Sequence, residues 1–176
     1  TAGALACNRI AKWDGSTWQP LGTGMTNGAV NALSVFGNRL IAGGDFTNAG
    51  GAAASYIARW DGNSWQPVGG GMNRSVYALR VHNGELVAGG NFETAGGNPI
   101  SYLARWNGLT WQAFGVDAFN GVIRAMVSYG GQLIVGGDFN RIGAATFNRI
   151  AKWNGAAWET LGVGVNSSVF SLSEHA

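Results

Sequence analysis

Trp60-Asp61-Gly62-Asn63-Ser64-Trp65 is a six-residue stretch in which two tryptophans flank a short polar turn. Closely similar stretches occur at 13–18, 106–111 and 153–158, and the four stretches together hold all eight tryptophans of the chain. The first tryptophans of successive stretches are 47, 46 and 47 residues apart. A fixed period in this range is typical of repeat proteins in which each repeat forms one supersecondary unit.

Each repeat contains four short apolar runs that are separated by turn residues. In the best-defined copy these runs are 75–82, 86–92, 101–106 and 111–114. Asn83-Gly84 joins the first two runs, and this dipeptide favours the type I′ turn of a two-residue hairpin. Four short strands joined in this way predict one antiparallel four-stranded sheet per repeat.

Glycine supplies 30 of the 176 residues and clusters between the apolar runs, as expected for a chain rich in turns. No segment keeps an apolar period of 3.6 residues for the ~10 residues that a helix needs. Radial repetition of four-stranded sheets produces a β-propeller. We therefore predict an all-β fold, a β-propeller of four-stranded antiparallel blades built from about four ~47-residue repeats.

The repeats predict a single domain over 1–176, with complete blades at about 29–69, 75–115 and 121–162. The remaining blade is expected to be split between the termini, with strands from 1–22 and from 168–176. This split blade lacks a strand, because neither segment contains an equivalent of 86–92. Unpaired strand edges are templates for another chain, so the gap predicts self-association.

An apolar run ending in Gly89-Gly90, followed by the turn between Trp106 and Trp111, resembles the kelch repeat. The sequence is more similar to kelch-like tandem repeats of secreted bacterial proteins, with a W-D-G-x-x-W-x-x-L-G core and a G-G-D-F element. It departs from the usual kelch form, because Trp replaces Tyr as the first aromatic residue and the turn is shorter. The resemblance implies a propeller used for binding or scaffolding. It does not imply the activity of galactose oxidase, whose copper site needs a Tyr, His and Cys constellation that this sequence lacks.

The tryptophans recur identically in every repeat, which favours packing between blades over a sugar-stacking surface. These predicted core residues are Trp13, Trp18, Trp60, Trp65, Trp106, Trp111, Trp153 and Trp158. Asp45, Asn91 and Asp138 each follow a glycine pair. We expect them to cap turns rather than to bind a cation, because oxygens one blade apart are too far apart to share an ion.

The loops between blades differ most from repeat to repeat, and loops on a rigid scaffold often carry function. In an antiparallel blade, the connections from second to third strand and from fourth strand to the next blade emerge on one face. We predict a ligand-binding face there, with neutral sequence variation in exposed loops as the alternative. Its residues are Arg74, Asp117, Phe119, Arg124 and Arg141.

Several classes of chemistry have no matching motif in the sequence. His82, His175 and Cys7 have no partners at metal-ligand spacing, so neither a metal site nor a cofactor is predicted. No nucleophile elbow or phosphate-binding loop is present, so the chain is not expected to be an enzyme. The net charge is +2 without a basic cluster, and no apolar run approaches the ~18 residues of a membrane helix. Nucleic-acid binding and membrane insertion are therefore not expected.

The sequence predicts a non-enzymatic binding or assembly module that is extracellular or on the cell surface. Charged residues are only 11% of the chain, against a usual ~25%, which suits such a location. Asn73 and Asn166 begin glycosylation sequons, which matter only in a glycosylating compartment. The expected partners are the protein itself, as a homo-oligomer or filament, or other proteins and glycans. The alternatives are a monomeric propeller that binds a glycan or protein through its loop face, and an enzyme built on a propeller scaffold.

Overall fold

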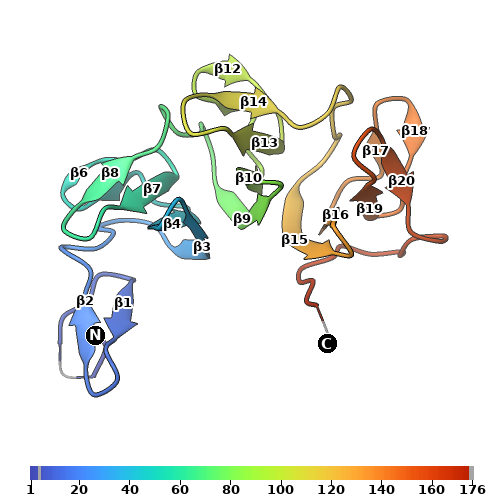
Figure 1. Cartoon of the computed structure of the whole chain (residues 1–176). Helices are drawn as coiled ribbons and strands as arrows, with labels where there is room; N and C mark the ends of the chain where they lie inside the picture. Colours follow the sequence, from blue (N-terminus) through green and yellow to red (C-terminus); the bar gives the residue numbers. More distant parts are fainter. Residues whose placement is uncertain (4, 175–176) are drawn as a thin grey trace.

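The computed structural model describes residues 1–3 and 5–174. All the regular secondary structure assigned in these residues is β-strand, so the predicted all-β class is confirmed. Three four-stranded antiparallel sheets follow one another along the chain, preceded by a two-stranded hairpin, and the units form a curved row (Figure 1). No helix in the described residues is long and apolar enough to cross a membrane.

The strands of the main sheets coincide with the apolar runs of the repeats. The N-terminal hairpin contains β1 (Ala11–Trp13) and β2 (Trp18–Pro20). The first sheet contains β3 (Val30–Phe36), β4 (Arg39–Gly44), β7 (Ile57–Trp60) and β8 (Trp65–Pro67). The second contains β9 (Val76–His82), β10 (Glu85–Gly90), β13 (Leu103–Trp106) and β14 (Trp111–Ala113). The third contains β15 (Ile123–Tyr129), β16 (Gln132–Gly137), β19 (Ile150–Trp153) and β20 (Trp158–Thr160).

Local turn chemistry explains how neighbouring strands are joined. Asn83 and Gly84 both have positive φ angles, 49° and 78°, as the predicted type I′ turn between β9 and β10 requires. Between β7 and β8, the Asp61 carboxylate accepts hydrogen bonds from the backbone N–H groups of Asn63 and Ser64, both at 2.8 Å. This turn sets Trp60 directly opposite Trp65 in the ladder.

The segments between the second and third strands of each sheet are more regular than the sequence suggested. Each forms a small hairpin of two-residue strands, which are too short to show an alternating pattern. In the second sheet Asn73 fixes this hairpin, because its Oδ1 accepts hydrogen bonds from the N–H groups of Glu93, at 2.8 Å, and Thr94, at 3.0 Å. The hairpins pair β5 (Asn48–Ala49) with β6 (Ala52–Ala53), β11 (Thr94–Ala95) with β12 (Asn98–Pro99), and β17 (Arg141–Ile142) with β18 (Ala145–Thr146).

Successive sheets pack face to face through the glycine pairs. A Cβ atom added to Gly89 would lie only 2.6 Å from Ile123 Cγ2 and 3.6 Å from Met126 Cε, both on the next sheet. Glycine at this position therefore lets β15 approach β10 closely. The phenylalanines that follow the glycine pairs, Phe46, Phe92 and Phe139, are completely buried.

The predicted split blade is not formed among the described residues. Val169 and Leu172 do pack against Gly136, as Ile123 and Met126 pack against Gly89, but residues 168–174 form no strand. The last two residues of the expected segment, 175–176, lie outside the described residues. Hairpin β1–β2 shares no sheet with 168–174, and the two segments lie at opposite ends of the curved row (Figure 1). The physical reason is the missing second strand, because in the complete sheets only that strand bonds to both the first and the third.

Candidate functional site

The structure does not bring the predicted loop-face residues together into one site. Arg74 forms an exposed ion pair with Glu93, with 3.3 Å between the charged atoms. Asp117 lies against Gly143, and Arg141 is exposed in β17. Phe119 is buried, with its ring against Phe139 and Trp158, so it contributes to the core rather than to a loop surface.

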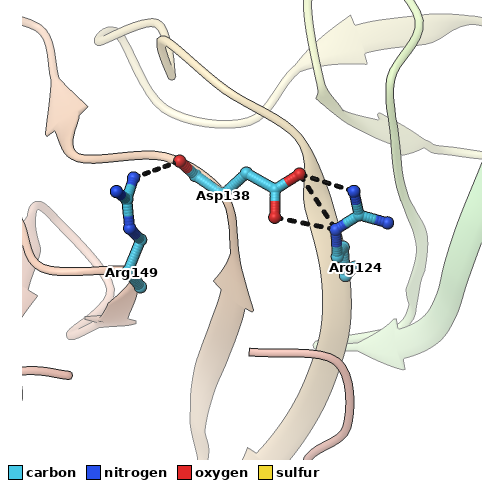
Figure 2. A network of polar contacts seen from close by, with 3 residues as sticks. All are labelled: Arg124, Asp138 and Arg149. Atoms are coloured by element: carbon cyan, nitrogen blue, oxygen red, sulfur yellow. Dashed lines mark hydrogen bonds and ion pairs between the residues drawn. The ribbon is translucent and has the colours of Figure 1, made fainter. Parts of the chain in front are cut away.

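Arg124 has a separate role, which Figure 2 shows. Its Nε donates to both oxygens of Asp138, at 2.8 and 2.9 Å, and its Nη2 donates to Oδ2 at 2.6 Å, while Arg149 donates to the Asp138 backbone oxygen. The hydrogen bonds from Arg124 hold the pKa of the Asp138 carboxyl below its usual value. The Arg124 guanidinium also lies over the rings of Tyr77, at 5.6 Å, and Phe170, at 5.0 Å. Because these rings belong to the units before and after its own, Arg124 ties three units together.

The sequence predicted that the residues after the glycine pairs cap their own turns, but the side chains of Asp45 and Asp138 contact the first strand of their sheet instead. Asp138 binds Arg124, and Asp45 accepts a hydrogen bond from Asn31 Nδ2 at 3.1 Å. In the second sheet Tyr77 stands at the position of Asn31 and Arg124, and the buried Oδ1 of Asn91 has no hydrogen-bond partner among the described residues. Within the part of the chain that the structure describes, no group of three or more His, Cys, Asp or Glu could hold a metal ion.

The acidic residues of the tryptophan turns are structural. The N–H groups of Thr17 and Ser16 bond to the Asp14 carboxylate and lower its pKa from 3.8 to about 2. In a later repeat the neutral Oδ1 of Asn107 accepts the same two hydrogen bonds, from Leu109 and Thr110, each at 2.9 Å. Since an amide replaces the carboxylate without loss of the turn, this position requires a hydrogen-bond acceptor and not a negative charge.

The most regular contact between units is a tryptophan that reaches back to the preceding unit. Trp65 Nε1 donates to the backbone oxygen of Leu21 at 2.9 Å, and Trp111 Nε1 donates to that of Val68 at 3.3 Å. Both indoles are only 3% exposed. Each bond joins the fourth strand of one unit to the end of the fourth strand of the unit before it.

A glycine next to the acceptor residue completes each of these contacts between units, which we call junctions. Gly22 and Gly69 follow the two acceptor residues and lie beneath the six-membered rings of Trp60 and Trp106. An added Cβ atom would come within 3.1 Å of Trp60 Cζ3 and 2.1 Å of Trp106 Cζ3. We call the acceptor residue and its following glycine the socket, and the two tryptophans of the next unit the tryptophan pair.

The third junction differs because its loop is longer. Three positions separate Gly22 from Met25 and Gly69 from Met72, but four separate Gly115 from Phe119. Gly115 still lies against the ring of Trp153, whereas the buried Nε1 of Trp158 has no hydrogen-bond partner among the described residues. One inserted residue therefore preserves the ring contact but loses the hydrogen bond.

Each end of the described chain carries one half of a junction. Trp13 and Trp18 form a tryptophan pair, and they are 53% and 42% exposed. Leu161 and Gly162 form a socket, and an added Cβ atom at Gly162 would meet nothing within 4 Å. The sequence predicted that the tryptophans pack between units, but it did not assign a role to these glycines. The sequence feature that could have revealed this role is the glycine that ends each stretch of the W-x-x-L-G type.

A separate groove of about 490 Å³ lies between the second and third sheets. Its polar wall includes the Glu85–Arg105 ion pair, with a separation of 3.1 Å, and its apolar wall includes Trp153. The buried His82 also lines it, and burial together with the nearby Arg80 lowers the pKa of the imidazole. At neutral pH the groove therefore offers a neutral imidazole, a paired carboxylate and an indole.

No protein-family model and no curated protein matches this sequence. Among solved structures, the chain is similar to the crystal structure of the computationally designed Ika4 protein, with a TM-score of 0.55. The similarity covers 90% of this chain and 88% of that chain at 16% sequence identity. At this identity the similarity concerns the fold alone, and it agrees with the repeated β-sheet architecture seen here.

Proposed function

We propose that this protein is a non-enzymatic binding and assembly module that self-associates through its incomplete end units. The observation that carries the proposal is the contrast between equivalent tryptophans. Trp65 and Trp111 are 3% exposed inside the row, whereas Trp13 and Trp18 are 53% and 42% exposed at its end. Trp158, in the third junction, is half-buried. Indole rings that are wholly or partly covered at the internal junctions are expected to be covered in the functional assembly as well.

Other apolar side chains are exposed at the same two ends. Leu33 and Val35 project from β3, the first strand of the first complete sheet. Val163, Val165 and Phe170 are exposed beyond β20. Apolar surface gathered at defined places is typical of protein–protein contacts, whereas single exposed apolar residues are ordinary.

The assembly we propose is a β-propeller whose blades are the four-stranded sheets. A ring of radially repeated sheets leaves only short, protected strand edges, so in the assembly the edge of β1 would no longer be free. The resemblance to kelch-like repeats supports this architecture, and the low charge content supports an extracellular or cell-surface location.

Light scattering across a dilution series tests self-association. We expect a mass that rises above the 18.3 kDa of one chain with increasing concentration. The double variant Trp13→Ser/Trp18→Ser should shift the protein toward monomer. The control is Leu109→Ser, which replaces an apolar side chain that is even more exposed, at 84%, but lies in an internal turn. A monomer at every concentration would remove the basis of the proposal.

The groove beside Glu85 and Arg105 favours a second candidate function, glycan binding. An indole beside polar hydrogen-bonding groups suits the apolar faces and hydroxyls of a sugar. Titration of the protein with neutral oligosaccharides, followed by NMR, would test this. Glu85→Gln should weaken binding, while Gln132→Ala, at the equivalent position of the third sheet, should not. Unchanged spectra throughout the titration would argue against a glycan site.

A further inference from the structure

We propose that the exposed tryptophan pair of one copy docks into the exposed socket of a second copy, in the register of the internal junctions. This inference rests on the proposed self-association and specifies its partner and contact. In the docked pair, Trp18 Nε1 donates to the backbone oxygen of Leu161, and the Trp13 ring covers Gly162. Each part of this contact has a counterpart inside the chain.

The tryptophan pair is already formed before docking. Trp13 and Trp18 have ring centroids 5.5 Å apart, against 5.4 Å for Trp60 and Trp65. The two pairs occupy equivalent positions, because each member of the first pair lies 47 residues before its counterpart. The exposed pair therefore has the shape that an internal socket accepts.

The socket is also formed before docking. Gly162 has a φ angle of 54°, and the internal socket glycines Gly22 and Gly69 have 58° and 54°. Three positions separate Gly162 from Val165, which matches the two junctions that keep their tryptophan hydrogen bond. The C-terminal socket is therefore of the type that accepts both the ring and the indole N–H.

The loop behind the socket is held in place in the same way. Val165 N–H donates to the Asn148 backbone oxygen at 3.0 Å, as Met25 N–H donates to that of Asn8 at 3.0 Å. In the internal junction Met25 then forms a β-bridge with Ala49. Met25 is fully buried, whereas Val165 is 44% exposed, so the bridge position beside the C-terminal socket is open.

The first residues of the chain supply the matching half of this bridge. Ala2 lies 47 residues before Ala49, and it already forms a small bridge with Leu5. In the internal junctions, Gly50 N–H donates to the Gly24 oxygen at 2.8 Å, and Gly96 N–H donates to the Gly71 oxygen at 2.7 Å. Docking in the same register pairs Ala2 with Val165.

A second copy of the chain is the partner whose tryptophan pair fits the exposed socket. The tryptophan pair belongs to β1 and β2 and the socket follows β20, and these strands lie in units at opposite ends of the curved row (Figure 1). Two different patches that recognise each other make a heterologous contact, which closes into a ring of copies or extends into a filament. The contact thus links copies head to tail.

Cysteine cross-linking tests this register. In a Cys7→Ala background, one preparation carries Ala2→Cys and the other carries Val165→Cys. Residues facing each other across an antiparallel bridge have Cα atoms about 4.5–5.5 Å apart, within the range of a disulfide. Oxidation of the mixture should give a covalent dimer of roughly twice the chain mass, and either preparation alone should give much less.

The internal pair Met25→Cys/Ala49→Cys is the positive control, because it occupies the same bridge position within one chain. If this control closes and the mixture still associates in light scattering without a covalent dimer, the register is wrong but self-association stands. If light scattering shows only monomers, the proposed function fails as well. If Ala2→Cys/Val165→Cys in one chain closes internally and the mixture gives no dimer, the socket is filled by the chain's own tryptophan pair, which overturns the inference.

Discussion

Trp65 Nε1 donates a hydrogen bond of 2.9 Å to the backbone oxygen of Leu21, 44 positions earlier in the chain. This bond joins the fourth strand of one unit to the unit before it, and Trp111 repeats it with Val68. The stability of each unit therefore depends on its neighbour, as is general for stacked repeats.

Replacing the internal and terminal tryptophans should have different consequences for folding. Trp65→Phe leaves the buried Leu21 oxygen without its donor and should lower the free energy of unfolding by about 1–3 kcal/mol. Trp18→Phe removes an N–H that has no partner within the described chain, and should leave the unfolding of dilute monomer almost unchanged. Urea denaturation followed by circular dichroism measures both, and equal losses would contradict the junction described here.

The two socket glycines Gly69 and Gly162 provide a matched comparison. Both have a φ angle of 54°, so alanine costs roughly 1–2 kcal/mol of backbone strain at either position. At Gly69 the new Cβ would also meet Trp106, which should add about 1–3 kcal/mol of overpacking. Thermal unfolding should therefore show a larger loss for Gly69→Ala than for Gly162→Ala.

A second measurement on the same variants separates folding from association. Gly162→Ala should weaken self-association in light scattering, because its Cβ would stand where the Trp13 ring docks. Unimpaired association of Gly162→Ala would contradict the proposed socket.

The ion pair of Arg124 and Asp138 should contribute more stability than an exposed pair. Both side chains are less than one-third exposed, and the contact is bidentate, so loss of either partner should cost about 1–3 kcal/mol. The exposed pair Arg74–Glu93 is the control, and its loss should cost less than ~1 kcal/mol. Double-mutant cycles measured by urea denaturation give both coupling energies. Equal coupling energies would show that the enclosed position of Arg124 has no energetic effect.

The contribution of the tryptophan turns to the stability of the fold should depend on pH, because the pKa values of Asp14 and Asp61 are lowered. A carboxyl whose pKa is lower in the folded than in the unfolded chain stabilises the fold above the unfolded value of 3.8. This stabilisation is lost as the pH falls from about 4 through the folded value, which is about 2 for Asp14.

Asparagine variants isolate that effect. Asp14→Asn/Asp61→Asn should keep both turns, as Asn107 and Asn154 do, but should reduce the loss of melting temperature between pH 4 and pH 2. Asp61→Ala should lower the melting temperature at neutral pH too, because the N–H groups of Asn63 and Ser64 lose their acceptor. An unchanged acid profile in the double asparagine variant would show that other carboxyls control acid unfolding.

The sequence by itself determined the strands and turns, because these depend on neighbouring residues. Asn83-Gly84 fits a type I′ turn wherever it occurs between strands, and Asp61 caps its turn through groups two and three positions away. The 47-residue period then implied repeated four-stranded sheets. Two-residue strands such as β11 carry no such signal, so the small hairpins were missed.

Only the tertiary structure decided which side chains meet between units. Phe119 was predicted to lie on a binding face, but the structure places it in the core against Phe139 and Trp158. Arg124 pairs with the carboxylate of Asp138, which follows the neighbouring strand β16. The sequence showed that the split blade lacks its second strand, but only the structure showed that residues 168–174 and β1 share no sheet without it. Turns are set by local backbone preference, whereas junctions depend on how sheets stack, and stacking brings together residues more than forty positions apart.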